Sequence, residues 1–60
     1  MIEASVLDFL AQERRRALSP REWRFRVMGY GYGVRDEGGR QVVTKLPQGT
    51  MLGVLPADFA

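Results

Sequence analysis

The chain has 60 residues, a formal net charge of +2, and neither cysteine nor histidine. A domain of this size buries only about 60% of the surface that its unfolded chain exposes. The composition also excludes disulfides, Cys/His zinc sites, thiol nucleophiles and imidazole bases. We therefore expect residues 1–60 to form one small binding domain that is not an enzyme, carries no metal or cofactor and takes no small-molecule substrate. Self-association or a constant partner would supply the missing stability.

The distribution of apolar and charged residues bears on location and partners. No apolar run approaches the roughly 20 residues of a membrane span, and the start of the chain lacks the basic residues of a secretory signal. These features predict a cytoplasmic protein with no membrane contact. Residues 21–45 hold six Lys/Arg against three acids, whereas residues 46–60 hold only Asp58.

The first element in chain order is a helix predicted over residues 3–18. Its start resembles a capping box, with Ser5 as the cap and Asp8 in place of the usual Glu. Its apolar residues follow helical spacing and fall on one side: Val6, Leu7, Leu10, Ala11, Ala17 and Leu18.

The segment after this helix has two interpretations. Ser19 could cap a second helix, with Pro20 at its first position and Glu22 closing the box. Alternatively, residues 19–22 form a turn, because apolar and charged residues alternate from Trp23 to Val27 with the period of a strand. We favour the second interpretation and predict a strand from Glu22 to Arg35, bent near its glycines.

Two more strands are expected. The segment Asp36–Gly39 has the composition of a hairpin turn, and the return strand covers Gln41–Leu46. After a second turn at Pro47–Gly49, a third strand covers Thr50–Leu55, and residues 57–60 form a tail. The predicted fold class is α+β, with one N-terminal helix packed on a three-stranded antiparallel β-meander.

Side chains alternate across a strand, which separates two faces of the predicted sheet. A turn over Asp36–Gly39 pairs Gly33 with Val42 and Tyr32 with Val43. We assign the glycine-bearing face to the core, because positions without side chains let a helix lie close. The predicted core is Val6, Leu10, Trp23, Phe25, Val27, Val42, Leu46 and Leu52.

The opposite face becomes the predicted site. It combines cations, which can meet phosphates, with tyrosine rings, which can stack on bases. Tyrosine and arginine are also enriched in protein interfaces, and we rank a protein interface above nucleic-acid binding. The candidate residues are Arg24, Arg26, Met28, Tyr30, Tyr32, Val43 and Lys45, with Arg15 and Arg16 on the helix.

A local resemblance adds to the nucleic-acid hypothesis. Trp23 stands six residues before Gly29-Tyr30-Gly31-Tyr32, and an acidic, glycine-containing turn follows. The stretch from Trp23 to Val43 resembles part of a cold-shock domain, whose aromatic side chains stack on bases. The resemblance implies base-stacking roles for Trp23, Tyr30 and Tyr32. It covers about a third of the chain, and the predicted N-terminal helix departs from the family's all-strand pattern.

The functional expectation has two forms. The first is a small protein-interaction module, such as a bacterial, phage or plasmid accessory protein that inhibits or adapts a host protein or nucleoprotein complex, for example in phage anti-defence. The alternative is a regulator that binds nucleic acid through the basic, tyrosine-bearing sheet face. A protein partner or a homo-oligomer is the preferred association, and a nucleic acid is the other.

Overall fold

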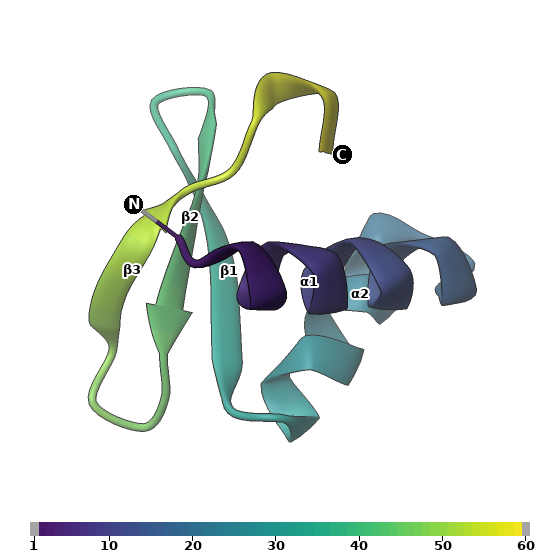
Figure 1. Cartoon of the computed structure of the whole chain (residues 1–60), viewed down its shortest axis with the longest axis horizontal. Coiled ribbons are helices and arrows are strands. Elements are labelled where there is room, and N and C mark those ends of the chain that lie inside the picture. The colour runs from purple at the N-terminus through teal and green to yellow at the C-terminus, as the bar shows by residue number, and fades with distance from the viewer. Residues whose placement is uncertain (1, 60) are drawn as a thin grey trace.

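The computed structural model describes residues 2–59 and has an α+β architecture, as predicted (Figure 1). Two helices, α1 (Ala4–Arg16) and α2 (Pro20–Gly29), precede an antiparallel sheet of β1 (Tyr32–Glu37), β2 (Arg40–Lys45) and β3 (Thr50–Val54). The strands lie in the order β1-β2-β3, and a 3-10 turn, Ala57–Phe59, follows. The predicted single helix is therefore replaced by a helical pair.

The second helix corrects the predicted long first strand. The Ser19 side chain accepts a hydrogen bond from the Glu22 backbone N–H at 3.1 Å, and Pro20 occupies the first helical position. The Glu22 carboxylate in turn accepts from the Leu18 N–H at 3.1 Å. The first bond satisfies an N–H group of the first helical turn, and the second holds the chain just before the cap. The capping signal thus outweighs the alternating pattern that favoured a strand.

Burial on α2 explains why the alternating pattern misled. Trp23 and Val27 are four residues apart, share one helix face, and are both fully buried. Phe25 lies between them in sequence, so a helix turns it to the opposite side, where it is 76% exposed. The prediction of Phe25 in the core is wrong for this reason. Gly31, with a φ of 95°, ends the helix and leads into β1.

The first helix also begins differently from the prediction. Glu3 is its N-cap residue, without a side-chain capping bond, and Ser5 lies inside the helix. The predicted capping box at Ser5 and Asp8 is therefore wrong. The helix ends at Arg16, because Ala17 is extended, and so stops two residues before the predicted end.

The β1–β2 hairpin is tighter than predicted. Its two-residue turn is Gly38–Gly39, and both residues have positive φ angles, 59° and 82°, as a type I′ turn requires. Glu37 consequently pairs with Arg40, and Tyr32 pairs with Lys45. The register is shifted by two residues from the predicted one, which leaves each side chain on its predicted face of the sheet.

The identity of the core face is reversed from the prediction. Val43 is fully buried with Leu10, Trp23 and Val27, and Tyr32 and Val34 pack against this cluster. The helices thus cover the tyrosine-bearing face. Gly33 lies on the other face, where an added Cβ would stand 2.7 Å from Thr44 Oγ1, so its lack of a side chain accommodates a neighbouring strand and not a helix.

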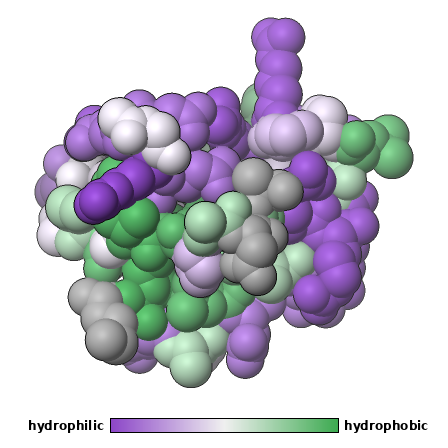
Figure 2. Space-filling view, turned by 90° about the horizontal axis from the view of Figure 1, so that it is seen from above, coloured by the Kyte–Doolittle hydropathy of each residue, from purple (hydrophilic) through white to green (hydrophobic). Residues whose placement is uncertain are grey.

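Residues near the start of the chain and after β3 complete the core. Ile2 and Leu55 are buried, and an added Cβ on Gly53 would stand 2.8 Å from Ile2 Cγ1. Hydrophobic residues nevertheless gather in one area on the left of the view in Figure 2, bordered by hydrophilic residues. Val6, Leu52 and Phe59 pack against the core while keeping part of their surface exposed.

Within residues 2–59, no helix combines the length and the apolar character needed to cross a bilayer.

The capping arrangement predicts unequal effects of two serine substitutions. Ser19→Ala removes the acceptor for the Glu22 N–H and should lower the free energy of unfolding by about 1 kcal/mol. For a domain of this size, that corresponds to a fall in Tm of about 4–8 °C. Ser5→Ala is the matched control, because Ser5 is exposed within α1 and alanine favours helix. Thermal unfolding followed by circular dichroism measures both, and equal shifts for the two variants would contradict the assignment.

Candidate functional site

The sequence-predicted cations do not form one patch, because carboxylates within the fold hold several of them. Arg24, on α2, donates from Nη2 to Asp36 Oδ2 at 2.9 Å. Both side chains are partly exposed, at 38% and 62%, so this pair contributes little to stability. The Asp36 carboxylate nevertheless occupies one edge of the Arg24 guanidinium and holds that group toward the end of the β1–β2 hairpin.

Glu13 neutralises two other predicted cations. Its side chain is only 3% exposed and lies 2.9 Å from Arg26 Nη2 and 3.4 Å from Arg16 Nη1. Arg26 Nε also donates to Glu13 Oε1 at 3.0 Å. A buried carboxylate needs such partners, so Arg26 joins α2 to α1 instead of standing ready for a phosphate.

Three of the predicted site residues do come together, around a ring that the sequence analysis left unassigned. Phe9 of α1 meets Tyr30 edge-on, with ring centroids 5.0 Å apart, and lies 5.7 Å from Tyr32. Lys45 Nζ stands 4.6 Å from the centroid of the Tyr32 ring, within cation–π range. Of these rings, Tyr30 is 63% exposed whereas Tyr32 is half-buried.

The remaining predicted residues divide between core and surface. Val43 is fully buried and cannot touch a partner. Trp23 is equally buried, and its Nε1 donates to Leu10 O at 3.1 Å. The base-stacking role that the cold-shock resemblance implied for Trp23 is therefore excluded. Met28 is 55% exposed, and Arg15 is exposed on α1.

Large apolar side chains are exposed on the outward side of α2 and just before its start. Leu18 is 90% exposed, Phe25 76% and Met28 55%. Phe25 and Met28 are three residues apart and Arg21 precedes Phe25 by four, so these side chains neighbour one another along the helix. We call these three side chains, Arg21, Phe25 and Met28, together with Leu18 just before the cap residue Ser19, the α2 surface. Arg21 is exposed and has no carboxylate partner among the side chains that the structure describes.

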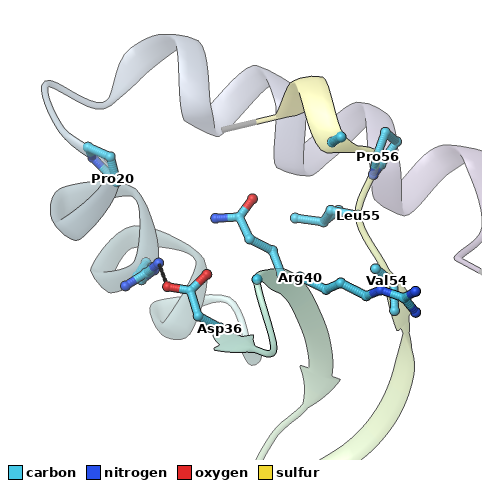
Figure 3. Close-up of a pocket in the computed structure, with 10 residues that line it drawn as sticks. Pro20, Asp36, Arg40, Val54, Leu55 and Pro56 are labelled. Atoms are coloured by element: carbon cyan, nitrogen blue, oxygen red, sulfur yellow. Dashed lines mark hydrogen bonds and ion pairs between the residues drawn. The ribbon is translucent and has the colours of Figure 1, made fainter.

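A cleft of about 530 Å³ opens where the start of α2, the β1–β2 hairpin and the segment after β3 meet (Figure 3). The Leu55 side chain points into it, and Arg40 extends along its rim toward Val54. The volume is within the range of small-ligand sites. Its acidic group, Asp36, is already engaged by Arg24, which leaves the cleft without a free acid–base pair among its lining residues.

The described residues offer few side chains suited to catalysis or to metal binding. No cluster of three or more His, Cys, Asp or Glu side chains suited to a metal ion occurs in the part of the chain that the structure describes. The comparisons add no assignment, because no protein-family model, no curated protein and no solved structure matches this chain.

Sequence reasoning missed the α2 surface because it placed Phe25 on a strand facing the core. The signal was nevertheless present, since Arg21, Phe25 and Met28 have spacings of four and three residues. That is the spacing of a single helix stripe. It becomes readable only once Ser19 and Pro20 are taken as the start of a helix.

The Glu13 contacts predict that its charge matters for stability. Glu13→Gln keeps the shape of the side chain but removes the charge that Arg16 and Arg26 share, and it buries an amide N–H₂ group. We expect a loss of about 1–3 kcal/mol in the free energy of unfolding, measured by urea denaturation. Asp8→Asn on the exposed side of the same helix is the control and should change stability by less than about 0.5 kcal/mol. A loss for Glu13→Gln no greater than that of the control would contradict the role of Glu13.

Proposed function

We propose that this protein is a small, non-enzymatic interaction module that docks on a protein partner through the α2 surface. The observation that carries the proposal is the exposure of Phe25, at 76%, on a helix whose other side is fully buried. Large apolar side chains gathered on a surface mark interaction sites. An aromatic ring beside an arginine has the composition of an interface hot spot.

The geometry favours a particular kind of partner. A helix that offers the apolar side chains of Phe25 and Met28 three residues apart on one face fits an apolar groove on another protein. Arg21 lies within the stripe and has no carboxylate partner among the described residues. The groove should therefore carry an acidic residue near its rim, because burying an unpaired guanidinium is costly. Such a module could act as an inhibitor or adaptor by occupying a groove on a larger complex.

Nucleic-acid binding is the second candidate, and one observation favours it. The exposed ring of Tyr30 stands beside Phe9, and Phe9 also contacts Tyr32 under Lys45. Base stacking on an aromatic ring contributes about 1–3 kcal/mol. However, Arg24, Arg26 and Arg16 are each held by a carboxylate, and this reduces the cationic surface that a phosphate backbone needs.

Two variants separate the candidates. Phe25→Ser combined with Met28→Ser should reduce binding to a co-purifying protein by at least about tenfold, as expected for hot-spot side chains. Both positions are exposed, so the fold should persist, as circular dichroism would show. Tyr30→Ala, matched in exposure, should leave that protein complex intact.

The measurement is a quantitative pull-down with the tagged protein after nuclease treatment, followed by titration of the recovered partner. A photoreactive phenylalanine analogue at position 25 should cross-link to the same partner, whereas the analogue at exposed Glu37 should not. The proposal fails if the double serine variant retains full binding. Loss of a nucleic acid from the complex on Tyr30→Ala, with a steep salt dependence, would instead establish the second candidate.

A further inference from the structure

Among the described residues, the outer side of β3 has no pairing strand, although Ile2 packs on its core face at Gly53. Within the described residues, β3 pairs only with β2, and it forms the outer strand at the left of the sheet in Figure 1. The backbone groups along an outer strand are a template on which another strand can pair. Natural proteins usually obstruct such an edge with lysine, with proline, or with a covering segment.

The chemistry of this edge is unusual for the chain. Residues 46–57 contain no charged side chain, and β3, Thr50–Val54, contains neither a charge nor a proline. The outer strand at the opposite side of the sheet, β1, contains Arg35, Asp36 and Glu37 in succession. The β1 edge of the sheet therefore carries charged residues, which disfavour pairing with another strand, whereas the β3 edge carries none.

The exposed side chains of β3 are also uncharged, and they lie on the sheet face that the helices do not cover. Met51 is opposite Thr44, and Val54 is opposite Val42. Val42 and Thr44 are nearly buried, whereas Met51 is 61% and Val54 41% exposed. Met51 and Val54 are therefore exposed apolar side chains of the outer face next to the free edge.

A second copy of the chain is the occupant that this edge fits. A twofold contact places the same strand against itself, so a charged residue near the axis would face its own like charge. A neutral strand avoids that repulsion. Pairing of two β3 strands would also close the assembly, because each copy offers its β3 edge only once and the β1 edges carry charge.

We propose that β3 pairs antiparallel with β3 of a second copy, which joins two three-stranded sheets into one six-stranded sheet. The Met51 and Val54 side chains of both copies then form one continuous apolar strip on the outer face. This proposal does not depend on the α2 surface, because α2 takes no part in the contact. It supplies the added stabilisation that a 60-residue chain without cysteine or histidine needs.

The test uses the purified chain alone, in size-exclusion chromatography with light scattering over a dilution series. The wild type should show twice the 6.8 kDa mass of the chain. Met51→Lys should raise the dimer dissociation constant by about tenfold or more, equivalent to 1.4 kcal/mol. Gln48→Lys is the control, because it adds the same charge in the exposed turn before β3 and should leave the dimer intact.

A second readout locates the contact. Amide hydrogen exchange along residues 50–54 should be slower in the wild-type dimer than in the Met51→Lys monomer, while β1 amides exchange alike in both. Val54→Lys serves as a second variant if Met51→Lys fails to fold. A wild type that stays monomeric at every concentration overturns the proposal. A dimer that dissociates on Phe25→Ser but not on Met51→Lys also overturns it, and would assign self-association to the α2 surface.

Discussion

The burial of Trp23 is the constraint on which the rest of this fold depends. Its ring is fully buried, its Nε1 donates to the carbonyl of Leu10 at 3.1 Å, and its ring centroid lies 5.7 Å from that of Phe59. One side chain thus ties α2 to α1 and to the C-terminal turn. A buried indole contributes more apolar area than almost any other side chain and needs a partner for its N–H, so few rotations of α2 can satisfy it.

The outward surface of α2 follows from this orientation. Once Trp23 and Val27 face the core, Arg21, Phe25 and Met28 must face away, because a helix separates them by about half a turn. The same rotation brings Arg26 to Glu13 of α1 and Arg24 to Asp36 of β1. The ion pairs and the exposed apolar side chains of α2 therefore both follow from the orientation of this helix. They also explain why a chain rich in arginine lacks the basic aromatic face that its sequence indicated.

The two proposed contacts lie on different elements and would reinforce one another. Pairing through β3 leaves α2 of both copies unoccupied, so a dimer would present two α2 surfaces in a fixed relation. Two linked sites can bind a repeated or twofold-symmetric partner far more tightly than one, without any new contact. For a chain of 60 residues with a small core, self-association would thus provide both stability and a second binding surface.

Local chemistry in the sequence determined the elements whose signals act over a few residues. Helical spacing identified α1, glycine pairs and prolines marked the turns, and these turns bounded β2 and β3. These signals fixed the α+β class and the side of the sheet on which each strand residue stands. The capping residues Ser19, Pro20 and Glu22 also contained the start of α2, although the alternating stretch that follows them favoured a strand.

Only the tertiary structure decided which pattern governs residues 23–27 and which sheet face is covered. Apolar residues at positions 23, 25 and 27 satisfy a strand, and the pair at 23 and 27 equally satisfies a helix, so the local pattern is ambiguous. Packing resolves it, because the helix places Trp23 in one buried core with Leu10 and Val43 and against the ring of Phe59. The site changes with that choice, since the face of Val43 becomes core and Phe25 becomes surface. The position of a binding surface thus depended on contacts between residues distant in sequence, which no local spacing can specify.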